Sequence, residues 1–200
     1  MKIIIPSLFL VVLFTIVFAS FRSNSKYETA SYSVKKEVSE NVEVRLYENL
    51  MLLTNYSSAG DNENDMFMSL FRFITGSNSK EEKIQMTTPV FKSTNNDVKT
   101  MSFVIPNKYK DQEVPKKTED GVVIKNEEIK NIEVLAIRFS GSSKDKYFKK
   151  KEQELKQIAI DNKIEADFEH PIKVYYNAPF VLPFFKRNEI MYVIKGYKFL

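Results

Sequence analysis

Cysteine is absent from the 200 residues of the chain, and histidine occurs only once. Without thiols the chain forms no disulfide, iron–sulfur cluster, cysteine-ligated zinc site or thiolate nucleophile, and no lipoprotein acylation. A single imidazole excludes a histidine-rich metal site and leaves no spare base for a Ser-His-Asp triad. We find no other catalytic constellation, so the sequence favours a protein that is not an enzyme.

Neither sign of charge dominates the composition. The chain has 30 lysines and arginines against 26 acidic residues, and this near balance does not indicate nucleic-acid binding. Low-complexity segments are missing, and aromatic residues make up 13% of the chain. These features predict one domain of ordinary size with a substantial apolar core.

Only one long apolar run is present, from Ile3 to Phe21. Such a run at residues 1–21 predicts either a signal peptide or an N-terminal membrane anchor. Val17 and Ala19 fit a cleavage site, whereas the length is also enough to cross a bilayer at about 1.5 Å per residue. Both alternatives predict an exported or membrane-anchored protein of the cell envelope or periplasm. The polar residues 22–31 predict a linker.

The first half of the domain has the pattern strand, helix, strand, strand. Residues 42–58 predict two extended stretches, in which Arg45 and Tyr47 alternate with apolar positions as in a half-buried strand. Segments 83–91 and 99–106 predict the two strands after the helix. The helix has apolar residues at i, i+3, i+4 and i+7, which form one stripe: Phe67, Leu70, Phe71 and Ile74.

The second half repeats the same order. A strand at 132–139 precedes a long helix that begins after Ser142 or Ser143, and strands follow at 172–179 and 188–197. We interpret this repetition as an internal duplication of a βαββ unit. Two such units predict an α+β fold, a curved antiparallel sheet with two packed helices. The concave space between the halves is then the expected ligand site.

Five blocks of sequence resemble the SOUL haem-binding family. KIQMTTPV (83–90), preceded by Gly-Ser-Asn at the end of the helix, resembles the family signature G-x-N … K-I-x-M-T-x-P-V. The other four blocks lie around it, so that all five stand in the family's order. They are VEVRLYEN (42–49), FVIPNKY (103–109) with VPKKTEDGVVI (114–124), AIRFSG (136–141) and YNAPFVLPFFKRNEI (176–190). The resemblance therefore identifies a SOUL haem-binding domain at residues 32–200.

The resemblance implies a distorted antiparallel barrel-like sheet with two helices, built from βαββ units related by a pseudo-twofold axis. The same architecture resembles gyrase-inhibitor-like effector-binding domains, which hold diverse amphipathic ligands. The resemblance to the SOUL family also implies non-covalent binding of haem or another tetrapyrrole. The expected affinity is weak, because no histidine is well placed as an axial ligand.

A haem site needs an apolar slot for the macrocycle and cations for the propionates. The predicted slot is walled by the helix stripe with Met86 opposite, although ordinary core packing explains the same stripe. Arg72 is the first predicted propionate partner, and Arg187 with Lys186 forms a second predicted cationic contact. Exposure to solvent is the alternative for Arg72, and a solvated turn or a bond to Glu189 is the alternative for the pair. The only imidazole, His170, lies in a charged stretch before a proline and is a poor candidate for an axial ligand. The complete set of predicted cofactor-binding residues is Phe67, Leu70, Phe71, Arg72, Ile74, Met86 and Arg187.

Two features suggest alternatives. Glu189 begins the last strand, and a desolvated carboxylate in the cavity predicts a binder or hydrolase of another amphipathic small molecule. Segment 179–187 carries four bulky apolar residues between two prolines and a basic pair. Such a loop seldom lacks a partner, so it predicts closure of the cavity, contact with a bilayer or contact with another protein.

Overall fold

The structure is a computed structural model that describes residues 27–58, 60–110, 114–115 and 123–195. The predicted leader at 1–21 and the first five residues of the predicted linker lie outside this range. Residues 28–30 of that linker already belong to the fold, since Glu28–Thr29 form strand β1 and Ala30 packs in the core. No helix within the described range is both long enough and apolar enough to span a membrane.

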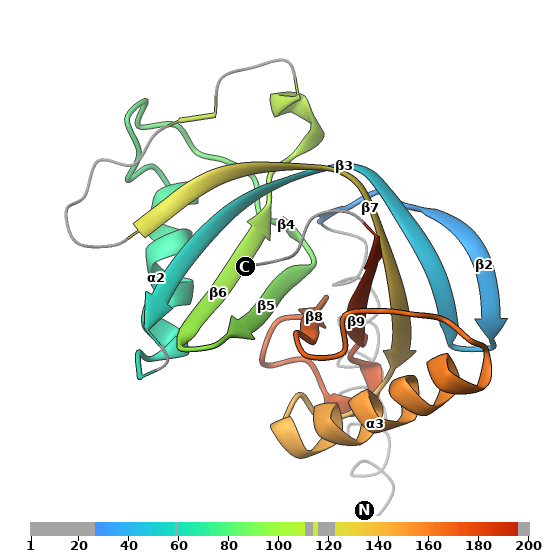
Figure 1. The fold of residues 1–200 in the computed structure, drawn as a ribbon. Helices are drawn as coiled ribbons and strands as arrows, with labels where there is room; N and C mark the ends of the chain where they lie inside the picture. Colours follow the sequence, from blue (N-terminus) through green and yellow to red (C-terminus); the bar gives the residue numbers. More distant parts are fainter. Residues whose placement is uncertain (1–26, 59, 111–113, 116–122, 196–200) are drawn as a thin grey trace, which may run out of the picture.

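Six antiparallel strands close into a barrel, in the order β3-β6-β5-β8-β9-β7 with β7 pairing back to β3 (Figure 1). A seventh strand, β2 (Ser33–Ser39), extends the sheet beside β3, and β1 pairs with the short β4 (Thr87–Thr88). The barrel strands are β3 (Val42–Ser58), β5 (Val90–Asn95), β6 (Val98–Val104), β7 (Val123–Phe139), β8 (Ile172–Tyr175) and β9 (Asn188–Lys195).

The predicted duplication is confirmed by the order of the elements. The first repeat is β3, α2 (Glu63–Ile74), β5 and β6, and the second is β7, α3 (Asp145–Asp161), β8 and β9. Each helix covers the outer face of its own repeat, as Figure 1 shows for α2 beside β6 and α3 below β9. The molecule is therefore an α+β fold, as expected.

The two longest strands are each continuous, although the sequence predicts each as two pieces. β3 and β7 have 17 residues each and pair from Val42 with Ile137 to Tyr56 with Val123. The polar residues at the middle of β3 do not end it, because the pairing with β7 keeps one register from Tyr47 to Leu50. Asn49 also donates a side-chain hydrogen bond to Glu128 on β7 at 3.0 Å. The continuity of β3 and β7 comes from their pairing with each other, which the local sequence of either strand does not reveal.

Side chains fill the barrel interior. The buried barrel-strand residues of this cluster come from β3, β5, β7, β8 and β9. They are Tyr47, Leu50, Leu52, Phe91, Ile129, Ile132, Val134, Ala136, Ile172, Val174, Met191 and Val193. Val104 of β6 packs against this cluster. The interior is thus a packed core.

Helix α2 is rotated from its predicted orientation. Its buried residues are Met66, Leu70, Phe73 and Ile74, which pack with residues of β3 and β6. Phe73, which the predicted stripe does not include, therefore joins Leu70 and Ile74 on the buried face. Phe67 and Phe71 lie at the edge of the helix–sheet contact, because residues 66, 70, 73 and 74 form the face nearest the sheet.

Candidate functional site: a cleft between the two repeats

A cleft of about 700 Å³ lies outside the barrel, between α2 and the segments around β8 and the start of α3. This volume falls within the range of about 300–1,000 Å³ typical of small-molecule sites. Both repeats contribute to it, as expected for a site between the halves. The lining residues are Tyr27, Glu63, Phe67, Phe71, Met86, Thr87, Thr88, Val90, Lys92, Ser143, Lys144, Asp145, Tyr175, Tyr176, Asn177, Ala178, Pro179 and Lys186.

The wall from the first repeat is apolar and aromatic. The rings of Phe67 and Phe71 stack with their centroids 6.0 Å apart and their planes 13° apart. Phe67 also meets Phe103 of β6 edge to face at 5.3 Å, which fixes its position against the sheet. Met86 and Val90 continue this wall.

Asn78 holds the segment that carries Met86. Its side-chain nitrogen donates to the carbonyls of Phe73, at 2.8 Å, and Glu82, at 2.7 Å, while its oxygen accepts from the amides of Lys80 and Glu82, each at 3.2 Å. The amide of Ile84 then donates to the carbonyl of Ile74 at 2.8 Å. Asn78 is the asparagine of the G-x-N block, so this signature residue joins the end of α2 to the KIQMTTPV segment.

The opposite wall comes from the second repeat and consists of residues 175–179 and the start of α3. The ring of Tyr175 packs on Phe148 of α3 at 5.1 Å, and the Lys92 ammonium lies 4.7 Å from its centroid. Burial raises the pKa of the Tyr175 hydroxyl, so this group stays neutral in the physiological range. This wall is therefore amphipathic.

Three lysines and two acidic residues border the cleft. Lys92 pairs with Glu63 at 2.8 Å, and Lys186 donates to the carbonyl of Pro179 at 3.0 Å. Asp145 is bound by Lys173 at 2.9 Å, and that hydrogen bond lowers its pKa. Lys144 stands at the beginning of α3. The rim thus offers cationic groups beside aromatic walls.

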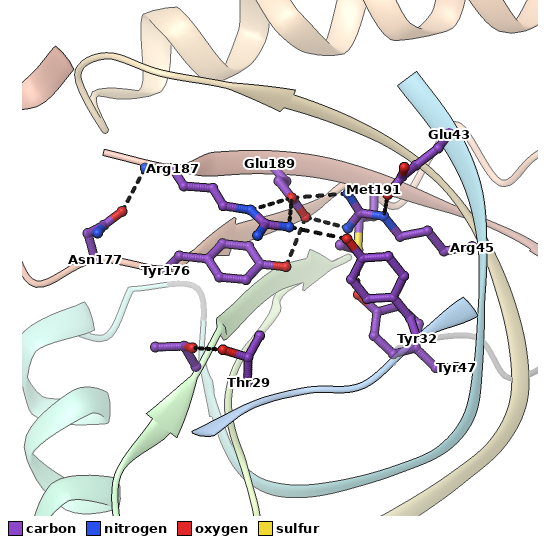
Figure 2. Close-up of polar contacts among 11 residues, drawn as sticks. Thr29, Tyr32, Glu43, Arg45, Tyr47, Tyr176, Asn177, Arg187, Glu189 and Met191 are labelled. Atoms are coloured by element: carbon purple, nitrogen blue, oxygen red, sulfur yellow. Dashed lines mark hydrogen bonds and ion pairs between the residues drawn. The ribbon is translucent and has the colours of Figure 1, made fainter. Parts of the chain in front are cut away.

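A buried charge cluster lies behind Tyr176 (Figure 2). Glu189 of β9 is fully buried and receives hydrogen bonds from Arg45 of β3 at 2.6 and 3.1 Å. Arg187 donates to the same carboxylate at 2.7 and 2.9 Å, and the Tyr176 hydroxyl donates at 3.1 Å. Glu43 pairs with the other side of Arg45.

The electrostatics of this cluster keep Glu189 ionised. Burial raises the pKa of its carboxyl, but the hydrogen bonds and charges of Arg45 and Arg187 outweigh burial, and the pKa lies below its ordinary value of 4.5. Burial together with the negative charge of Glu189 raises the pKa of Tyr176. A carboxylate bound by three donors is a poor base. Glu189 is also not among the residues that line the cleft, so the alternative with Glu189 in the cavity does not fit this geometry.

The structure places three of the seven predicted site residues in the cleft, namely Phe67, Phe71 and Met86. Leu70 and Ile74 lie in the core beneath α2. Arg72 is exposed, Arg187 is bound to Glu189, and neither lines the cleft. Their roles as ligand contacts stay predictions.

His170 lies away from the cleft lining, with its Nδ1 atom 3.0 Å from the Asp167 carboxylate. The sequence interpretation included Lys186 of the rim but missed Lys92, Lys144 and the wall at residues 175–179. The block YNAP (176–179) was available as a signal, because it is one of the segments that carry the family resemblance.

Comparison with known families settles the relationship of the chain. A family model described as SOUL heme-binding protein matches residues 27–193. The chain belongs to the SOUL haem-binding family. No protein of curated function matches the sequence significantly.

Two solved structures share the fold of this chain at low sequence identity. The EcmrR C-terminal domain is 11% identical, with 83% of this chain and 99% of that chain covered and a TM-score of 0.52. A hydrolase from Listeria innocua is 12% identical, with 84% and 99% covered and a TM-score of 0.52. At these identities the likeness shows the fold alone.

The residues of the cleft fit the ligand class of the SOUL family. Two stacked phenylalanines and Met86 suit a flat apolar ring system, and the lysine rim suits carboxylate substituents. The lining contains no imidazole. Across the described residues, no group of three or more acidic, histidine or cysteine side chains could hold a metal ion directly.

Proposed function

We propose that the chain binds haem or a related tetrapyrrole non-covalently in this cleft, as a carrier in the cell envelope and not as an enzyme. The observation that carries the proposal is a cleft of about 700 Å³ with an aromatic wall and a lysine rim in a SOUL family member. The cell-envelope location rests on the apolar run at residues 3–21.

Each wall has its own part in this proposal. Phe67 and Phe71 come from the first repeat and Tyr175 from the second, and their rings offer apolar contact to a planar ligand. Lys144 and Lys186 attract its carboxylates at the rim. Since the lining lacks histidine, binding depends on the walls and not on an imidazole bond to iron.

The test is a titration of residues 22–200 with haemin, followed by the Soret band and by quenching of tyrosine fluorescence. We expect saturable binding in the low micromolar range. Absence of both a Soret shift and quenching at these concentrations would contradict the proposal.

The variant His170→Ala tests the position of the ligand. We expect its haemin affinity to stay within about twofold of the unmodified protein, because His170 is bound by Asp167 outside the cleft. A loss of tenfold or more would place the iron near His170 instead.

A second candidate is binding of another amphipathic molecule in the same cleft. Glu63 and Asp145 at the rim favour this possibility, because they add two acidic groups to the three lysines. Mass spectrometry of molecules retained through purification distinguishes the two candidates. A retained porphyrin supports the first, and a retained non-porphyrin amphiphile supports the second.

A further inference from the structure

Residues 180–185 expose apolar side chains on an ordered loop, which we call the aromatic knuckle (Phe180 to Phe185). Phe180 is 85% exposed, Phe184 65% and Leu182 40%. These three bulky side chains are concentrated within five residues. Isolated exposed apolar residues need no explanation, whereas such a concentration marks a contact surface.

Backbone contacts fix the shape of the knuckle. The short helix η2 (Pro183–Phe185) begins with a proline, and the Phe185 amide donates to the Leu182 carbonyl at 3.0 Å. The Gly141 amide donates to the Pro183 carbonyl at 2.9 Å, which joins the knuckle to the loop before α3. Val181 is buried and anchors the segment. The exposed rings are therefore presented by a defined structure.

The charges around the knuckle are mainly positive. Residues 174–185 contain no charged side chain, and Lys186 follows directly. Through the contact between Gly141 and Pro183, the knuckle adjoins the start of α3, where Lys144 and Lys146 are exposed. The exposed Asp145 between them is paired with Lys173. Aromatic side chains beside lysines are the composition of protein surfaces that lie on anionic bilayers.

The knuckle also borders the mouth of the cleft. Ala178, Pro179 and Lys186 line the cleft, as does Tyr27, the first described residue. The apolar run of the sequence ends at Phe21, and the six residues from there to Tyr27 span at most about 20 Å. An anchor formed by this run would hold the cleft within that distance of the bilayer.

We propose that the aromatic knuckle docks on an anionic lipid bilayer, with Phe180, Leu182 and Phe184 at the boundary between headgroups and acyl chains. Docking in this way turns the mouth of the cleft toward the membrane. The proposal does not depend on which ligand the cleft holds.

The absence of tryptophan from the chain allows a direct test. The variant Phe184→Trp places the sole tryptophan on the knuckle, and Ile160→Trp is the matched control. Ile160 is 65% exposed, as is Phe184, but it lies about 24 Å along α3 from Lys144. Residues 22–200 are used for the test, because they contain all described members of the three apolar clusters, from Ala30 to Ile194.

The two reporters are mixed with vesicles of phosphatidylcholine alone or with phosphatidylglycerol added. We expect the emission of the knuckle reporter to shift to the blue with the anionic vesicles, and brominated lipids to quench it. The control reporter should show neither effect. The two tryptophan variants made in the full chain and reconstituted into these vesicles should show the same difference in emission shift and in quenching.

A shift of the knuckle reporter without vesicles that grows with protein concentration would assign the surface to a second copy of the chain and overturn the proposal. No response to either vesicle, or an equal response of both reporters, would also overturn it. The double variant Phe180→Ser with Phe184→Ser should lower vesicle binding at least about tenfold. Its haemin titration without vesicles should be unchanged, which separates this test from that of the proposed function.

Discussion

Glu189 shows how a single residue can connect the two repeats without lining the cleft. Its carboxylate joins Arg45 of the first repeat to Arg187 and Tyr176 of the second. A buried ion pair adds little net stability over an apolar replacement, but removal of one partner leaves an uncompensated charge. Loss of the Glu189 carboxylate would remove the shared ion-pair partner of Arg45 and Arg187.

We therefore expect Glu189→Gln to lower the free energy of unfolding at pH 7 by about 3–5 kcal/mol, measured by urea denaturation. The control is Glu154→Gln, which breaks the exposed pair with Lys151 at 2.7 Å and should cost less than about 1 kcal/mol. Equal losses in the two variants would show that the buried cluster has no special role.

The same residue predicts a pH dependence. The pKa of Glu189 is lower in the folded state than its ordinary value of 4.5, so the unfolded state binds more protons as the pH falls. Its contribution is complete above pH 4.5 and is lost as the pH falls toward the folded-state pKa. Stability of the unmodified protein should decline more steeply below pH 4.5 than that of Glu189→Gln. Parallel curves would contradict this assignment.

Phe71 is the residue that separates a binding role from a packing role. Phe71 and Met68 are both exposed on α2, but only Phe71 lines the cleft. We expect Phe71→Ala to weaken haemin binding about tenfold, since about 1.4 kcal/mol of apolar contact is lost. Met68→Ala should leave the affinity within twofold, and neither variant should change the urea midpoint greatly. Equal affinities for the two variants would remove Phe71 from the site.

At the scale of the element, the asparagine of the family signature acts as a structural link. Asn78 is buried and uses both its donor and acceptor groups between the end of α2 and the KIQMTTPV segment. This arrangement explains why the segment follows the helix so closely. The link also holds the backbone that presents Met86 to the cleft.

We expect Asn78→Ala to lower the free energy of unfolding by about 2–3 kcal/mol, because buried backbone groups lose their partners. Asn162→Ala is the control, as its side chain donates to the Ile158 carbonyl at 2.9 Å in an exposed position. That variant should lose less than about 1 kcal/mol in the same urea titration. A loss of similar size at both positions would argue against the linking role.

The elements also show where sequence patterns reach their limit. The spacing of apolar residues at 3.6 per turn correctly located α2. It could not decide whether Phe71 or Phe73 faces the sheet, because both positions carry phenylalanine. In β3 the alternation suggested that Arg45 and Tyr47 face outward. Both are buried inside the barrel, because β3 is covered on its two faces and Arg45 finds its partner 144 residues away. Local alternation contains no information about such a distant partner.

At the scale of the whole molecule, the repeated order of elements and the family blocks were enough to predict the α+β fold. A cleft lined by both repeats is present, and its role as the ligand site stays a prediction. The cleft's position outside the barrel could not be predicted, because it depends on how α2 and residues 175–179 approach each other. The rim lysines come from both repeats, and no local motif distinguishes them from other surface lysines.

Barrel closure predicts a pattern of hydrogen exchange. The amides of β3 and β7, which pair over almost their full lengths within the barrel, should exchange close to the rate of global unfolding. β2 is an exposed strand with one partner and two register shifts, so its amides should exchange much faster. Exchange followed by mass spectrometry measures this contrast. Equal protection of β2 and β3 would contradict it.

The repeats are joined by two ladders, β3 with β7 and β5 with β8, and the cleft lies between α2 and the segment after β8. Any occupant of the cleft therefore touches both copies of the ancestral unit at once and acts as a non-covalent crosslink between them. Its concentration in the compartment would then set the resistance of the whole barrel to heat and proteolysis, since binding to the folded chain alone shifts the unfolding equilibrium.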